Sequence, residues 1–119
     1  RYEDVICMDS TRVILKDRTP DNDYIHANWM DMPDGQRYIC TQETLEDFWH
    51  MVYTEKSSVI VMLCCLREGN NEKCVLYYPR CDEECSKCGT YKVFYKEILP
   101  NPCSSVKHSV FTLKNVPRR

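Results

Sequence analysis

Cysteine is the residue with the greatest capacity for chemistry in this chain, and its spacing is uneven. Three of the nine cysteines fall in one short segment, and two further candidate ligands follow it: Cys81, Cys85, Cys88, Cys103 and His108. Thiolates and imidazoles suit structural zinc, but a complete tetrahedral set usually shows two paired spacings. Because the second half is here a lone residue, we expect a cysteine-rich loop over residues 80–89 and no bound cofactor. A small zinc-stabilised interaction domain is the alternative.

A second pattern pairs a cysteine with an arginine. Among the nine cysteines, only Cys74 has an arginine six positions later, at Arg80. A phosphate-binding cradle needs small residues with free backbone N–H groups. The residues between these two are bulky and include Pro79, which has no N–H to donate. We therefore interpret Cys74 as a structural cysteine and expect no catalytic residue in this chain.

The apolar periodicity predicts an α+β fold with one main helix. Residues 24–30 alternate in polarity as a strand does, and 37–41 form the expected hairpin partner. Leu45, Phe48 and Val52 mark one face of a helix, which Thr44 is placed to cap. Further strands are predicted over 59–65, 73–78, 91–96 and 106–116. Together these elements predict a twisted, mixed or antiparallel sheet in one truncated domain, 1–119, in which 90–116 are a strand pair.

The apolar run 59–65 has an additional implication. A strand that is apolar on both faces needs a layer above and a layer below it. One helix cannot supply both layers, so we expect an unprotected apolar surface and self-association. The chain also starts at Arg1 instead of Met, and we expect it to be a piece of something longer.

Composition excludes several classes of protein. The chain has 119 residues, of which 43% are hydrophobic and 29% charged, as in one small globular domain. A net charge of −2 without a basic cluster argues against nucleic-acid binding. The longest apolar run is too short to cross a membrane. The odd number of cysteines, several within apolar runs, indicates a reducing, cytoplasmic compartment.

Seven short motifs carry a resemblance to a known family. In chain order they are RYEDV, DSTRV, DYIHAN, YICTQ, DFWHMV, VIVML and KCVLYYP, between residues 1 and 79. Their order and spacing resemble the N-terminal half of the cysteine-dependent protein tyrosine phosphatase domain. Residues 90–116 resemble the strand pair that follows in that family.

The resemblance implies hydrolysis of phosphotyrosine in proteins through a cysteinyl-phosphate intermediate. That family uses a His-Cys-five-residue-Arg loop and a Trp-Pro-Asp loop, and this sequence contains neither. We therefore expect the chain alone to be inactive, on the cytoplasmic side of a membrane receptor or in a soluble protein. A non-catalytic, phosphatase-like binding module is a second alternative.

Four residues match supporting positions of the family. By resemblance, Tyr2 packs on the phosphotyrosine ring and Asp4 accepts hydrogen bonds from the backbone of the substrate peptide. Glu68 pairs with the phosphate-clamping arginine, and Lys73 contacts the loop that carries the general acid. The partners of Glu68 and Lys73 are absent from this sequence.

Overall fold

The computed structural model describes residues 4–42, 45–81, 83 and 85–117. The expected substrate-binding Tyr2 and the expected cap Thr44 therefore lie outside the described residues. The chain separates into two compact units, Arg1–Lys56 (the N-terminal unit) and Ser57–Arg119 (the C-terminal unit), and each is described by itself. None of the helices in the described part is long and apolar enough to span a membrane.

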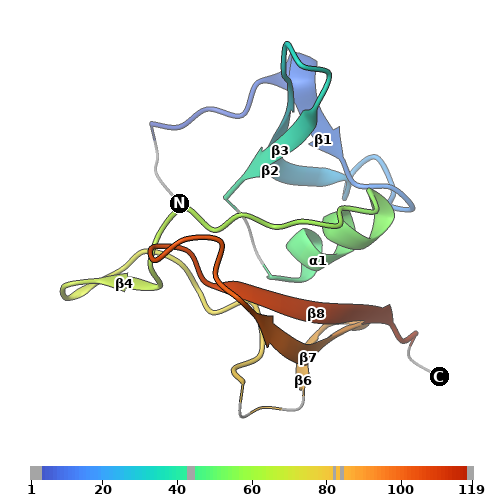
Figure 1. The fold of residues 1–119 in the computed structure, drawn as a ribbon. Coiled ribbons are helices and arrows are strands. Elements are labelled where there is room, and N and C mark those ends of the chain that lie inside the picture. The colour runs from blue at the N-terminus through green and yellow to red at the C-terminus, as the bar shows by residue number, and fades with distance from the viewer. Residues whose placement is uncertain (1–3, 43–44, 82, 84, 118–119) are drawn as a thin grey trace. The chain divides into compact units, whose positions relative to one another are not determined.

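The N-terminal unit is an antiparallel three-stranded sheet with a helix against it (Figure 1). Its elements are η1 (Asp9–Thr11), β1 (Arg12–Ile14), β2 (Tyr24–Asp31), β3 (Arg37–Thr41) and α1 (Leu45–Thr54). The turn from β2 to β3 needs Gly35, whose φ of 81° is costly for other residues. Val13 of β1 and Leu15, just after β1, pack on one face with Ile25 and Ala27 of β2 and with Met51 of α1.

Polar contacts fix α1 and the loop after β1 together. The Nε2 atom of His50 lies 2.5 Å from the carbonyl oxygen of Lys16. The ammonium group of Lys16 in turn lies 2.8 Å from the carboxylate of Glu55. The predicted strands at 24–30 and 37–41 and the predicted helix are thus all present, and the α+β class with one main helix is confirmed.

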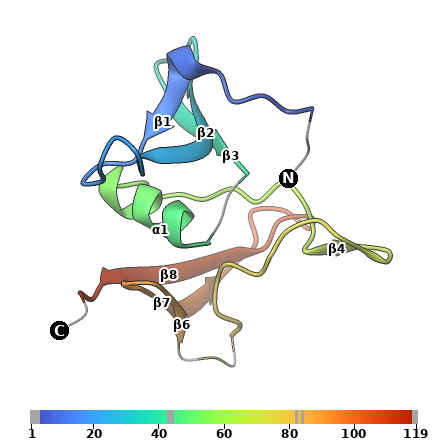
Figure 2. The same cartoon turned by 180° about the vertical axis from the view of Figure 1, so that it is seen from behind.

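The C-terminal unit contains a second three-stranded antiparallel sheet and a small hairpin (Figure 2). The sheet consists of β6 (Cys85–Cys88), β7 (Tyr91–Leu99) and β8 (His108–Asn115), and the hairpin of β4 (Arg67–Glu68) and β5 (Asn71–Glu72). Two tight turns use glycine at positive φ, Gly69 between β4 and β5 and Gly89 between β6 and β7. Cys88, Tyr91 and Val93 are the buried side chains of this sheet.

Two predicted strands do not form. Residues 59–65 and 73–78 have no regular structure, and the side chains of Val59 and Leu63 are 73% and 94% exposed. A strand exists only when a neighbour completes its hydrogen bonds, and neither segment pairs in any sheet of the described residues. The expected loop 80–89 is also wrong in part, because Cys85–Cys88 pairs with β7 as strand β6. The predicted pair over 90–116 is accordingly part of a three-stranded sheet.

Candidate functional site

Asn28 of β2 holds the N-terminal segment that leads to Asp4. Its amide nitrogen donates to the carbonyl oxygen of Met8 at 2.8 Å and to the hydroxyl of Thr11 at 2.9 Å. Its amide oxygen accepts a hydrogen bond from the backbone N–H of Met8 at 3.3 Å. The thiol of Cys7 also donates to the carbonyl oxygen of Ala27 at 3.6 Å. The segment is therefore fixed along β2, with exposed Asp4 three residues beyond its last contact at Cys7.

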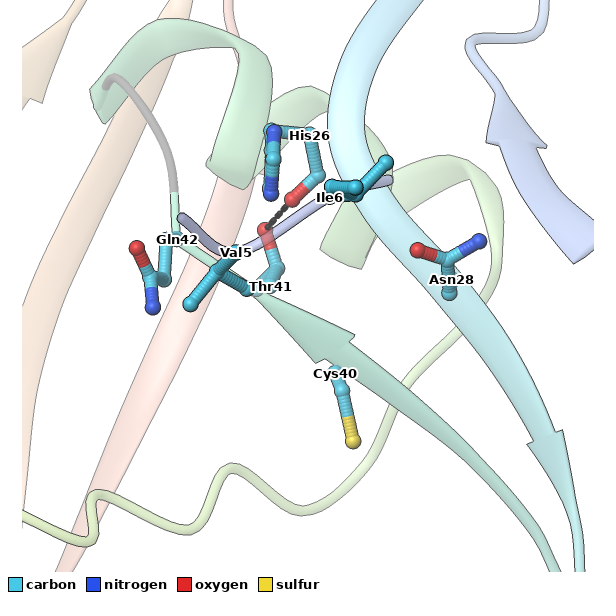
Figure 3. Close-up of a pocket in the computed structure, with 7 residues that line it drawn as sticks. All are labelled: Val5, Ile6, His26, Asn28, Cys40, Thr41 and Gln42. Carbon is cyan, nitrogen blue, oxygen red and sulfur yellow. Dashed lines mark hydrogen bonds between the residues drawn. The ribbon is translucent and has the colours of Figure 1, made fainter. Parts of the chain in front are cut away.

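A cavity of about 180 Å³ lies between this segment and the sheet (Figure 3). It is lined by Val5, Ile6, His26, Asn28, Cys40, Thr41 and Gln42. The hydroxyl of Thr41 donates to the carbonyl oxygen of His26 at 3.2 Å, which ties the end of β3 to β2. The same carbonyl accepts the N–H of Gln42 at 3.3 Å. Hydrogen bonds thus hold the ends of β2 and β3 together at one wall of the cavity. Asp4 directly precedes Val5, which lines the cavity.

The second pair of predicted site residues lies on the hairpin of the C-terminal unit. The ammonium group of Lys73 is 3.9 Å from the carboxylate of Glu68. The two side chains are 31% and 55% exposed, so the pair contributes little to stability. In the hairpin, Arg67 lies opposite Glu72, and this register brings the side chains of Glu68 and Lys73 near each other. Asp4 lies in the N-terminal unit, whereas Glu68 and Lys73 lie in the C-terminal unit.

Cys74 has the opposite of the properties that a thiolate nucleophile needs. Burial, together with the neighbouring thiol of Cys64, raises the pKa of Cys74 above its ordinary value. A reactive cysteine instead has a lowered pKa in electropositive surroundings. The N–H of Arg80 is taken by the carboxylate of Glu83 at 3.0 Å, which puts a negative charge where a phosphate would have to bind. The segment 74–80 therefore offers no phosphate cradle.

The four cysteines among the candidate zinc ligands do not assemble. Cys88 is buried in β6, Cys85 is half-buried on the same strand, and Cys81 and Cys103 are exposed. Nowhere in the described ranges do three His, Cys, Asp or Glu side chains gather as metal ligands would. The alternative of a zinc-stabilised domain therefore receives no support from the geometry.

Sequence reasoning did not identify Asn28 or the cavity-lining residues as parts of a site. Asn28 occupies an outward position of an alternating strand, where a polar residue needs no special explanation. Its role depends on which segment lies beside β2, and that is a long-range contact. A usable signal was the short polar string Asp9-Ser10-Thr11, which has no periodic pattern and needs an external partner for its backbone.

The clamp made by Asn28 gives a first testable prediction. Asn28→Ala removes three hydrogen bonds, each of which contributes about 1 kcal/mol net. We expect the N–H of Met8 to exchange with solvent at least several-fold faster, measured by amide hydrogen exchange. Asn22→Ala, in the turn before β2, is the matched control and should leave Met8 unchanged. Equal exchange rates of the Met8 N–H in both variants and in the unsubstituted chain would show that Asn28 does not hold this segment.

Tyr77 gives a second prediction, on pH. Burial and then the neighbouring Cys74, Tyr78 and Cys64 raise the pKa of Tyr77 to about 12. Since the folded pKa exceeds the ordinary tyrosine value of 10.0, this contribution to stability is complete below pH 10.0 and is lost as the pH rises through about 12. A tyrosinate absorbance titration should show a late component near pH 12 that Tyr77→Phe removes. Tyr53→Phe, at an exposed ring, should retain it.

The comparisons with known proteins agree with each other. A family model described as protein-tyrosine phosphatase matches residues 1–119. The mouse "Tyrosine-protein phosphatase non-receptor type 7" is 36% identical over 134 residues, which cover 94% of this chain and 36% of that protein. The zebrafish (Danio rerio) "Receptor-type tyrosine-protein phosphatase F" is 43% identical over 86 residues, or 66% of this chain and 4% of the relative.

A viral protein is also similar to this chain. The "Tyrosine phosphatase-like protein J1" of Microplitis demolitor bracovirus is 38% identical over 103 residues, which cover 82% of this chain and 34% of that protein. The chain thus spans about a third of the length of two of these relatives and a small part of the third.

Proposed function

Because the chain belongs to the protein-tyrosine phosphatase family, we propose that it is the N-terminal portion of a domain that hydrolyses phosphotyrosine in proteins. In this proposal the portion helps to recognise the substrate and supports the active-site loops, but does not itself carry out the chemistry. The observation that carries the proposal is the match of the family model to all 119 residues of a sequence that lacks the family's two catalytic loops.

Tyr2 and Asp4 have the recognition role in this proposal. The contacts of Asn28 and Cys7 support it, because they hold the backbone that follows Asp4 against β2. A carboxylate on a fixed segment loses less conformational freedom when it accepts hydrogen bonds from a peptide backbone. Tyr2, by the family resemblance, would stack its ring on the phosphotyrosine ring.

Glu68 and Lys73 have a supporting role. Their ion pair is long, at 3.9 Å, and partly exposed, so breaking it would cost little free energy. In the complete domain Glu68 would pair with the arginine that clamps the phosphoryl oxygens, and Lys73 would contact the loop of the general acid. The thiolate nucleophile, that arginine and the acid would all come from chain beyond this sequence.

The setting and the partners follow from the same proposal. The partner would be a phosphotyrosine-containing protein, met in the cytoplasm or on the cytoplasmic side of a receptor. The relatives include both receptor and non-receptor proteins, so both arrangements are compatible with it. In isolation the chain would also self-associate through the exposed apolar residues of 59–63.

Two experiments test the proposal. Sequencing the encoding transcript beyond the codon for Arg119 should reveal a Trp-Pro-Asp loop followed by a His-Cys-five-residue-Arg loop in frame. An immediate stop codon would contradict the proposal and leave a phosphatase-like module.

Titration calorimetry on the chain alone distinguishes that module directly. A phosphotyrosine peptide and its unphosphorylated counterpart should give equally negligible heats, because the phosphate cradle is absent. A selective heat with the phosphorylated peptide would instead identify the chain as a non-catalytic binding module.

A further inference from the structure

The apolar run 59–63 has unpaired backbone groups as well as exposed side chains. Its residues lie in no helix or strand, and no backbone hydrogen bond joins them to another of the described residues. Backbone N–H and C=O groups that have no protein partner must be satisfied by water. The backbone of this run is therefore available to a strand of another chain.

Exposure alternates along this run as it does along an extended strand. Val59, Val61 and Leu63 are each at least 70% exposed. Ile60 is 40% exposed, and Met62 is half-buried. Successive side chains of an extended backbone point to opposite sides, so one side of the run is more open to solvent along its length. The run thus presents an open apolar side together with its unpaired backbone groups.

The composition of the run suits pairing with a copy of itself. Its sequence, Val-Ile-Val-Met-Leu, is rich in β-branched residues and contains no glycine or proline. No Asp, Glu, Lys or Arg occurs between Ser57 and Leu66, so identical segments can lie side by side without repulsion between like charges. Short segments with high β-propensity, low charge and no proline are those that stack with their own copies.

The open edges of the two three-stranded sheets are less suitable partners. Their outer strands are β1, β3, β6 and β8, and each carries a charged side chain. These side chains are Arg12, Arg37, Lys87 and Lys114. Charged residues on an edge strand oppose its pairing with another chain. Among these alternatives, the same run of a second copy is the partner that best matches the uncharged run.

We propose that the run 59–63 pairs with the same run of other copies of this chain in an intermolecular β-ladder. This inference rests on the self-association included in the function proposed above, and it names the partner and the bonds. Each added copy leaves its own outer edge unpaired, so the ladder does not close at a dimer. A two-stranded ladder is also only marginally stable in water. Assemblies larger than a dimer should therefore form as the concentration rises.

Amide hydrogen exchange, followed by mass spectrometry, tests the ladder. The chain is compared in a dilute, monomeric sample and in a concentrated, associated sample. We expect the N–H groups of 59–63 to exchange at least about tenfold more slowly in the associated sample, because they become hydrogen-bonded. In the monomer they should exchange as fast as those of an unstructured peptide, because they have no backbone partner there.

Two variants of one residue separate the ladder from apolar contact alone. Val61→Pro keeps an apolar side chain but removes an N–H that the ladder needs, whereas Val61→Ala keeps the N–H and removes apolar surface. We expect Val61→Pro to weaken association at least about tenfold more than Val61→Ala does. Both variants should retain the circular dichroism of the dilute chain, since the N–H of Val61 has no backbone partner in the described residues.

The outcomes distinguish this inference from the rest of the proposed function. A monomer at every concentration would overturn the self-association and the ladder together. Association without slower exchange in 59–63, slower exchange only in β8 or in 74–78, or equal weakening by the two variants would overturn the ladder alone. None of these results would alter the phosphotyrosine role, which the transcript sequence beyond Arg119 tests separately.

Discussion

Ile25→Ala is expected to destabilise the N-terminal unit by about 2–5 kcal/mol, because it opens a cavity at the centre of the core. Ile25 is 0% exposed and packs with residues of β1, β2 and α1. Both tryptophans, Trp29 and Trp49, belong to this unit, so intrinsic fluorescence reports on its unfolding alone. The midpoint of urea unfolding should fall by about 1 M or more.

Ile14→Ala is the matched control for this core prediction. Ile14 lies in β1, opposite Tyr24, but its side chain is 54% exposed. Removing an exposed side chain typically changes stability by no more than about 0.5 kcal/mol. A similar shift of the midpoint in both variants would show that the core does not lie where Val13, Leu15 and Ile25 meet.

The second large effect concerns the apolar run 59–63. Val59, Val61 and Leu63 are each at least 70% exposed, an unusual concentration of apolar surface for a small chain. Burying one such side chain contributes about 1.5–3 kcal/mol, so self-association of the chain should be readily measured. We expect Val61→Lys combined with Leu63→Lys to weaken association by at least about tenfold, since it removes two buried contacts and adds like charges.

Sedimentation velocity over a range of concentrations measures this association. Ser57→Lys combined with Ser58→Lys adds the same charge just before the run without removing apolar surface, and should leave most of the association intact. If the unsubstituted chain sediments as a monomer at every concentration and unfolds in a concentration-independent transition, the apolar run does not drive association.

The elements that sequence patterns predicted correctly share a physical property. Strands β2 and β3 pair with each other through a short turn, and β7 and β8 do the same through a longer connection. Their partners are neighbours in the chain, so a local pattern contains most of the information. The run 59–65 has an equally strong apolar pattern, but a strand there needs a partner that the described chain does not provide. The apolar pattern of 59–65 therefore predicted a strand that does not form.

Strand β6 illustrates the opposite error. Cys85-Ser86-Lys87-Cys88 is short, polar and rich in cysteine, and that composition favoured a loop. The strand forms because Gly89 permits a tight turn that returns the chain along β7, and because Cys88 is buried beside Tyr91. A cysteine at this place behaves as a small apolar residue instead of a ligand.

The site could be predicted only in part for a similar reason. The family resemblance predicts site roles for Asp4, Glu68 and Lys73, and the side chains of the last two form an ion pair in the structure. The sequence motifs could not identify the clamp at Asn28, because its three hydrogen bonds to residues 8–11 depend on a tertiary contact.

The central claim is that this chain supports phosphotyrosine chemistry without performing it. The measurement that tests it most directly is turnover of a phosphotyrosine peptide by the purified chain, followed by release of inorganic phosphate, with the Cys74→Ser variant assayed beside it. We predict no release above the buffer rate for either protein, because burial raises the pKa of the Cys74 thiol and the segment 74–80 offers no phosphate cradle. Clear turnover by the unsubstituted chain would contradict the claim, and its loss in Cys74→Ser would identify Cys74 as the nucleophile.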